Sequence, residues 1–222
     1  MNTLIIVPAY NESRVIAQTL IELRKNTNAD ILLVDDGSTD QTTQKAQDAG
    51  VKTVRHLINL GLGAAIETGL EYARRNNYDQ AVTFDADGQH NPKDIQKLLT
   101  ALQEHDLVVG TRQINPTRMP LVKRLGNKIL NLLTAIIFGV SCADTQSGLR
   151  ALNKKAINTI RIKTNRYEVS SEILFEAQRN KLKIGEVPVE VIYTPHSLSR
   201  GTNVKEGIKI LWRMIIHDRR GP

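Results

Sequence analysis

Two carboxylates, Asp85 and Asp87, come directly after the apolar run 81–84. Along an extended backbone, side chains two positions apart point to the same side. Two carboxylates on one side repel each other unless a cation lies between them. Oxygen ligands select hard ions such as Mg²⁺ or Mn²⁺, and Mg²⁺ usually also takes ligands from substrate phosphates. The pattern favours a metal site that serves a phosphorylated ligand, with a surface turn built from Asp and Gly as the alternative.

Short apolar runs that could position these carboxylates recur along the first half of the chain. They are residues 4–7, 31–34, 81–84 and 107–110, and a further strand is expected over 51–54, where two valines flank Lys52 and Thr53. The segments between them have apolar residues at helical spacing, as at Val15, Ile16, Leu20 and Leu23. Strands alternating with helices indicate an α/β protein with a mainly parallel central sheet and helices on both faces.

Polar residues predict where the helices begin. The candidate caps are Asn11 or Ser13 for the first helix, Asp40 or Thr39 for a helix over 41–49, and Asn91 with Pro92 at the first helical position for the helix after the carboxylates.

Polar clusters follow four of the expected strands. They are residues 9–13, 35–40, 85–90 and 111–112. In open parallel sheets, ligands bind beyond the carboxyl ends of the strands. The four clusters should therefore converge in space and form one site, with His90 as a further candidate for substrate contact.

The second half of the chain differs in composition. Residues 1–112 hold 11 Lys/Arg against 15 Asp/Glu, a net −4, and residues 113–222 hold 19 against 8, a net +11. A basic half indicates an anionic partner or a solvated face. Nucleic acid is disfavoured, because aromatic residues are only 4% of the chain and few platforms exist for base stacking. The single cysteine, Cys142, excludes an intramolecular disulfide and suits a reducing cytoplasm.

Several elements are expected in this basic half. A helical stretch over 119–140 begins with basic residues, and its apolar part, 129–140, is shorter than the roughly twenty residues of a membrane span. Both a buried helix and a helix lying on the membrane remain open. A turn over 143–148 should return the chain to the site, followed by a helix over 168–180 and an edge strand over 184–193 that contains Pro188.

The motifs IVPAYNE, VDDGSTD, FDADGQH, VVGTR and DTQSGLRA occur in this order and together resemble the family 2 glycosyltransferases. The similarity is to the dolichol-phosphate mannose synthase-like branch, which loads a sugar onto a polyprenyl phosphate, and it covers about residues 1–200. The resemblance implies a GT-A-type nucleotide-diphospho-sugar transferase fold, a UDP- or GDP-sugar donor, Mg²⁺ or Mn²⁺, and inversion at the anomeric carbon. It also implies a peripheral position on the cytoplasmic face of the membrane.

Roles for individual residues follow from the same resemblance. The positions matched to nucleotide-sugar contacts are Pro8, Tyr10, Glu12, Asp36, Gly63 and Ala86, together with the metal-site residues Asp85, Asp87 and Gln89. Arg112 matches a basic residue near the diphosphate, and Arg200 matches one on a loop, here 194–202, that closes over the phosphates. Lys123 and Arg124 fall where the acceptor phosphate binds.

The chemistry expected of such a site fits these residue types. A departing diphosphate is stabilised by a divalent ion and by arginines, whose forked geometry suits phosphate oxygens. A lipid monophosphate has a second pKa near ~6 and is largely ionised at neutral pH, so it needs little help from a general base. Asp144 is a candidate base or positioning residue, with a turn-forming Asp as the alternative. Gly61 and Gly63 predict a close backbone approach without a complete phosphate loop, because Ile66 stands where a third glycine is needed.

The sequence predicts a catalytic domain over 1–200 and an amphipathic helix over 201–222 packed on it, without a transmembrane segment. A separate small membrane protein and homo-oligomerisation are open as further partners. Three alternatives remain: the same donor chemistry with a soluble or polysaccharide acceptor in cell-envelope glycan synthesis, a nucleic-acid-binding module, and an inactive membrane adaptor.

Overall fold

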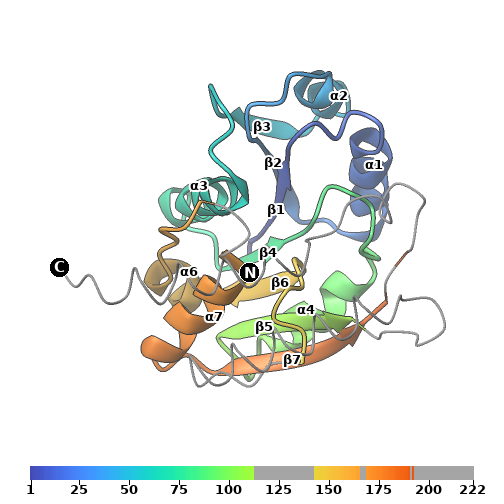
Figure 1. Cartoon of the computed structure of the whole chain (residues 1–222). Coiled ribbons are helices and arrows are strands. Elements are labelled where there is room, and N and C mark those ends of the chain that lie inside the picture. Colours follow the sequence, from blue (N-terminus) through green and yellow to red (C-terminus); the bar gives the residue numbers. More distant parts are fainter. Residues whose placement is uncertain (113–142, 166–168, 191, 193–222) are drawn as a thin grey trace, which may run out of the picture.

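The computed structural model describes residues 1–112, 143–165, 169–190 and 192 of the 222-residue chain. Its centre is one seven-stranded sheet with the order β3-β2-β1-β4-β6-β5-β7 (Figure 1). The strands are β1 (Thr3–Ala9), β2 (Asp30–Asp35), β3 (Lys52–Arg55), β4 (Gln80–Thr83), β5 (Leu107–Arg112), β6 (Arg150–Asn153) and β7 (Ile184–Val189). All pairings are parallel except the two that β6 makes with β4 and β5. The expected mainly parallel α/β sheet is confirmed.

Helices cover both faces of the sheet, as the alternating pattern predicts. They are α1 (Ile16–Asn26), α2 (Thr42–Asp48), α3 (Leu62–Arg75), α4 (Asp94–Ala101), α6 (Lys154–Thr159) and α7 (Val169–Arg179). Apolar residues of α1, α2 and α4 belong to one buried cluster, and those of α3, α6 and α7 belong to the other. The two clusters lie on opposite faces of the sheet, so the sheet is buried on both sides.

The apolar run of β1 shows why these residues form a central strand. Ile5 and Val7 pack in the cluster with α1, whereas Leu4 and Ile6 pack in the cluster with α3. All four are fully buried, and each such side chain contributes about 1.5–3 kcal/mol of transfer free energy. On the α3 side, a Cβ at Gly69 would lie 2.3 Å from Ile6, so this close helix–strand packing requires glycine.

The expected helix caps are corrected by the structure. The residues that precede α1, α2 and α4 are Val15, Gln41 and Lys93, and none of these three caps its helix through a side-chain hydrogen bond. Asn11 and Ser13 instead bind the loop after β2, because contacts between loops outweigh local capping here. Asp40 lies one residue before Gln41 and accepts the backbone N–H of Thr42. Pro92 lies two residues before α4 rather than at its first position.

The structure adds β6 and α6, which the sequence did not predict. β6 has only four residues and begins with the charged Arg150, so it lacks an apolar run. It lies antiparallel between β4 and β5 and separates two strands that alternation alone would place as parallel neighbours. Among the described residues β7 pairs with β5 alone, which confirms the edge strand, although β7 ends at Val189 rather than at residue 193.

Several predictions concern residues outside the described ranges. They are the helices over 119–140 and 201–222, the loop 194–202, the boundary between residues 200 and 201, and the candidate residues Lys123, Arg124 and Arg200. Within the described ranges, none of the helices has the length and apolar character that crossing a membrane requires.

Candidate active site

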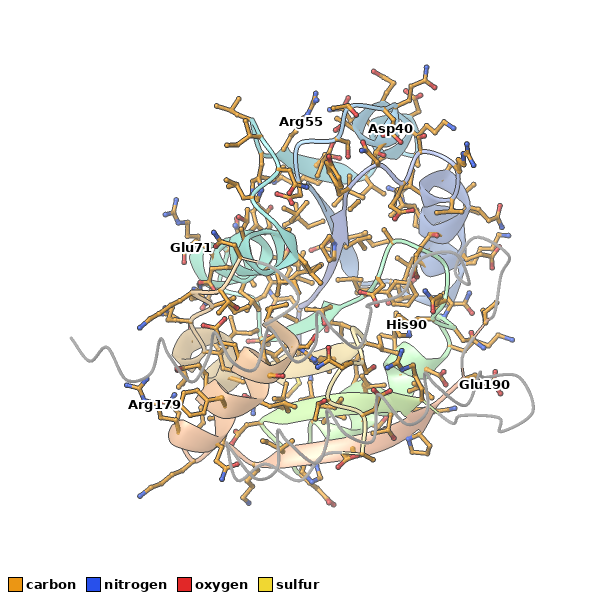
Figure 2. The ribbon with its side chains drawn as sticks, viewed as in Figure 1. Asp40, Arg55, Glu71, His90, Arg179 and Glu190 are labelled. Carbon is orange, nitrogen blue, oxygen red and sulfur yellow. The ribbon has the colours of Figure 1, made fainter. Side chains whose placement is uncertain are left out.

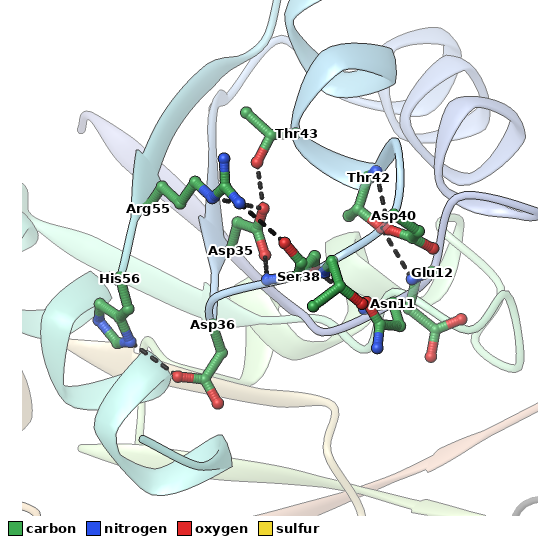
Figure 3. A network of polar contacts seen from close by, with 11 residues as sticks. Asn11, Glu12, Asp35, Asp36, Ser38, Asp40, Thr42, Thr43, Arg55 and His56 are labelled. Carbon is green, nitrogen blue, oxygen red and sulfur yellow. Dashed lines mark hydrogen bonds and ion pairs between the residues drawn. The ribbon is translucent and has the colours of Figure 1, made fainter. Parts of the chain in front are cut away.

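The carboxyl ends of β1, β2, β4 and β5 lie at one edge of the sheet, and the polar clusters that follow them lie along it. Two of these clusters are joined directly by hydrogen bonds (Figure 3). The backbone N–H of Asn11 donates to Ser38 Oγ at 2.9 Å, and its side chain accepts from the N–H of Thr39 at 2.9 Å. The N–H of Glu12 donates to Thr42 Oγ1 at 2.8 Å. The predicted convergence of residues 9–13 and 35–40 is therefore confirmed.

Asp36, one of the residues matched to nucleoside contacts, already binds its own chain. Its Oδ1 accepts the N–H of Leu60 at 2.9 Å and lies 2.8 Å from His56 Nδ1, and its Oδ2 accepts the N–H of Gly61 at 2.7 Å. The other nitrogen of His56 lies 2.9 Å from Thr68 Oγ1 on α3. Asp36 thus fixes the loop that leads from β3 into α3, and a carboxylate with about four acceptor positions has about one left.

The close backbone approach predicted at Gly63 is confirmed, and the backbone that approaches it is a distant segment of the same chain. Its N–H donates to the carbonyl of Asn165 at 3.0 Å, and a Cβ at this position would lie 1.9 Å from the carbonyl oxygen of Thr164. The start of α3 is therefore packed against the segment that follows α6. Contact of Gly63 with a nucleotide stays a prediction.

Asp85 and Asp87 lie beyond the end of β4. Asp87 belongs to a turn rather than to an extended segment, which corrects the simple alternation expected from the sequence. Asp85 Oδ2 lies 3.0 Å from His90 Nε2. Asp87 Oδ1 accepts the N–H of Gln89 at 3.0 Å, and its Oδ2 accepts the side-chain amide of the same residue. His90 contacts a carboxylate and is buried, whereas Arg179 and Glu190, labelled with it in Figure 2, are exposed.

The pKa values of the two carboxyl groups are shifted in opposite directions. Burial raises the pKa of Asp87, and the negative charge of Asp85 raises it further, only partly offset by the hydrogen bonds from Gln89. Burial also disfavours ionised Asp85, but the hydrogen bond from His90 and the charges of His90, Arg112 and Arg150 hold its pKa below the usual range. The negative charge of Asp85 is therefore balanced by its neighbours, whereas a negative charge on Asp87 is not fully balanced by the surrounding protein.

Arg112 and Asp144 form a forked ion pair at the same edge. Arg112 Nε lies 2.5 Å from Asp144 Oδ2, Nη2 lies 2.8 Å from Oδ1, and the backbone N–H of Arg112 donates to Oδ2 at 3.2 Å. Asp144 is 6% exposed. The turn over 143–148 thus returns to the site as predicted, and a carboxylate engaged by both oxygens favours the positioning role for Asp144 over that of a base.

The remaining matched residues differ in exposure. Tyr10 is 43% exposed at the edge of the sheet, whereas Pro8 is enclosed within β1 and Glu12 is buried. Ala86 is also buried, and its carbonyl accepts Thr19 Oγ1 at 3.2 Å. Of these four residues, Tyr10 therefore presents the most side-chain surface to a ligand at this edge, and the ligand contacts expected of the other three stay predictions.

The donor set fits a divalent cation that takes further oxygens from a phosphorylated ligand. The described residues contain no group of three or more His, Cys, Asp or Glu able to hold a metal ion. Asp85 and Asp87 supply two carboxylates, and Gln89 adds an amide that carries a carbonyl oxygen. The raised pKa of Asp87 marks a place where added positive charge is favourable. An incomplete protein ligand set is typical of Mg²⁺ at substrate phosphates.

Comparison with known proteins identifies the family. The sequence model of glycosyl transferase family 2 matches residues 4–161, which include β1 to β6 and both carboxylates. The chain belongs to glycosyl transferase family 2. It is therefore a glycosyltransferase, as the motifs predict.

Curated relatives place the chain within the family. It is 39% identical over 236 residues to the UDP-N-acetylglucosamine–dolichyl-phosphate N-acetylglucosaminyltransferase of Methanococcus voltae, covering 96% of this chain and 94% of that protein. It is 31% identical over 204 residues to the undecaprenyl-phosphate mannosyltransferase of Micrococcus luteus, covering 86% and 84%. It is also 44% identical over 219 residues to an uncharacterised protein of Methanocaldococcus jannaschii, covering 96% and 90%. The expected branch of polyprenyl-phosphate sugar transferases is thus confirmed.

Solved structures support the fold. Glucosyl-3-phosphoglycerate synthase from Mycobacterium tuberculosis, crystallised with Mn²⁺, UDP-glucose and phosphoglyceric acid, superposes with a TM-score of 0.74 at 19% identity. The match covers 96% of this chain and 77% of that chain. The GT-A-type fold expected from the sequence is therefore confirmed.

Proposed function

We propose that this glycosyltransferase moves a sugar from a nucleotide-diphospho-sugar to a polyprenyl phosphate, with inversion and with Mg²⁺ or Mn²⁺. The observation that carries the proposal is the meeting of Asp85, Asp87 and the Arg112–Asp144 pair at the carboxyl edge of the sheet. Relatives named for dolichyl-phosphate and undecaprenyl-phosphate supply the acceptor class.

The donor end of the proposed site lies along β1 and β2. Asp36 retains about one acceptor position after its three contacts within the chain. Uracil offers a single N–H between two carbonyls, whereas guanine offers adjacent N–H and NH₂ donors that call for both carboxylate oxygens. This difference favours a UDP-sugar over a GDP-sugar. A relative named for UDP-N-acetylglucosamine agrees with this choice.

The transfer step is a single displacement. A phosphate oxygen of the acceptor forms a bond to the anomeric carbon while the bond from that carbon to the diphosphate breaks, which inverts the configuration. Asp85, Asp87 and Gln89 would hold the cation, which supplies positive charge to the leaving diphosphate. Arg112, held in place by Asp144, adds a fixed positive charge beside it. The acceptor phosphate is already ionised, so no protein group has to remove a proton from it.

The lipid acceptor sets the proposed location, the cytoplasmic face of the membrane. The basic composition of residues 113–222, a net +11, supports attraction to an anionic surface, and each such charge near the bilayer is worth about 1 kcal/mol. Lys123 and Arg124 are proposed for the acceptor phosphate and Arg200 for the diphosphate. These three assignments rest on the sequence alone.

The deciding experiment is a screen of nucleotide sugars against a polyprenyl phosphate, with Mn²⁺ and with a chelator. We expect a lipid-linked sugar phosphate from a UDP-sugar, formed only in the presence of the metal. The matched control acceptor is the same polyprenol without its phosphate, which should give no product. Transfer to a soluble acceptor such as phosphoglyceric acid, with none to the lipid phosphate, would contradict the proposed acceptor.

A further inference from the structure

We infer that His90 is a positioning residue that fixes the carboxylate of Asp85 for metal binding. The inference rests on the proposed function, because it takes Asp85 as a metal ligand. In this role His90 acts on the cation through Asp85 and not by direct contact. The contact that carries it is the one between His90 Nε2 and Asp85 Oδ2, at 3.0 Å.

His90 is buried in a position where its ring can hydrogen-bond to Asp85 Oδ2. Its side chain is 4% exposed, and its ring packs edge-on against Phe84, with the ring centres 5.7 Å apart and the planes at 66°. Nε2 must carry the hydrogen, because an ionised carboxylate only accepts. Among the described residues, no group forms a hydrogen bond with Nδ1. The ring therefore has a single polar contact there, and that contact is Asp85.

The same carboxylate is also packed closely against Gly148. Thr83 Oγ1, at the end of β4, donates to the carbonyl of Gly148 at 2.7 Å and holds it in place. A Cβ at position 148 would lie 2.2 Å from Asp85 Oδ2 and 2.3 Å from Oδ1. The carboxylate thus occupies the space that any larger residue would need. His90 and Gly148 together define one orientation of Asp85.

A fixed orientation matters because the neighbouring group is also an acid. Asp85 and Asp87 lie two positions apart beyond the end of β4, so their like charges repel each other across the proposed metal site. Without a donor at Oδ2, Asp85 could rotate away from Asp87 and relieve this repulsion. The hydrogen bond from His90 opposes that rotation and keeps both acids available to one cation. Residues with this task typically change metal affinity by about 10–100-fold when they are replaced.

The test is direct titration of the intact protein with Mn²⁺, in the presence of UDP, followed by electron paramagnetic resonance of the free ion. We expect His90→Leu, which removes the donor at similar volume, to weaken Mn²⁺ binding about 10–100-fold. His90→Gln should restore most of the affinity, because its side-chain N–H₂ reaches a similar position. His105→Leu is the matched control, since His105 also hydrogen-bonds in a half-buried site but contacts Ala101 far from Asp85.

A second variant probes the same carboxylate without altering His90. Gly148→Ala should displace Asp85 sterically and weaken Mn²⁺ binding in the same way. If His90→Leu and Gly148→Ala both bind Mn²⁺ as the unaltered protein does, the inference is overturned. Loss of affinity in His90→Gln equal to that in His90→Leu would also overturn it, because packing alone would then explain the effect. Failure of the unaltered protein to bind Mn²⁺ would instead refute the proposed metal site itself.

Discussion

Asp36 and Asp87 lie beyond strands at the same edge of the sheet, but they are surrounded in opposite ways. Asp36 contacts two backbone N–H groups and the ring of His56. Asp87 is contacted by Gln89 and lies near the like charge of Asp85, which together with burial raises its pKa. One acid is matched by donors of its own chain, and the other is left with a charge that favours a cation.

This difference distinguishes a carboxylate that stabilises the fold from one that binds a ligand. A buried carboxylate that accepts several N–H groups stabilises the loop that supplies them, so its removal should appear mainly in folding. A carboxylate placed beside another acid lowers stability and persists where a ligand needs it. The comparison therefore predicts that the two acids respond differently to the same kind of substitution.

The substitution Asp87→Asn should have the largest effect, and this effect is on catalysis. Transfer should fall by at least about 10²-fold, because stabilisation of the leaving diphosphate is lost. Stability at neutral pH should stay equal or rise, since the folded-state pKa of Asp87 is raised and its charged form is unfavourable there. This gain should shrink at acid pH, where Asp87 takes up a proton in the unaltered protein.

Turnover at saturating Mn²⁺ and urea unfolding at two pH values measure the two parts of this prediction. Asp79→Asn, at the opposite edge of the sheet, is the control and should leave turnover unchanged. Full activity of Asp87→Asn at saturating Mn²⁺ would remove Asp87 from the metal site.

The substitution Asp36→Ala should have the second-largest effect, and this effect is on the stability of the fold. The backbone N–H groups of Leu60 and Gly61 lose their acceptor, and His56 loses its partner. Unfolding free energy should fall by about 2–3 kcal/mol, as measured by urea denaturation. Asp48→Ala is the matched control and should cost less than about 0.5 kcal/mol, because within the described part of the chain Asp48 accepts one hydrogen bond, from the exposed amide of Gln44. Equal losses in both variants would contradict the structural role of Asp36.

The smallest effect concerns Asp40, an exposed acid beside the Asp36 region. Burial works against its ionisation, but hydrogen bonds from Thr42 and Ser13 outweigh it and lower its pKa to about 2. A depressed folded-state pKa adds stability above the unfolded value and loses it as the pH falls toward 2. Asp40→Asn should therefore cost less than about 1 kcal/mol near neutral pH, because solvent screens this exposed site. The difference from the unaltered protein should narrow in acid, and a constant difference in urea unfolding would argue against it.

The sequence by itself determined the features that depend on local pattern. Residues 4–7 and 31–34 are uninterrupted apolar runs, and only strands buried on both faces require them. The polar clusters follow such strands directly, so parallel topology brings them to one edge without knowledge of the side-chain contacts. The order of the motifs was enough to indicate the family that the comparisons confirm.

Tertiary structure decided what each polar residue does at that edge. Asp144 pairs with Arg112 across 32 positions, and Asp36 accepts from Leu60 across 24. Arg150 begins a strand in the middle of the sheet, where it is 1% exposed and donates to the carbonyls of Thr145 and Ser170. No local pattern predicts these partners, because a buried charge is stabilised by whichever acceptors the completed fold brings to it.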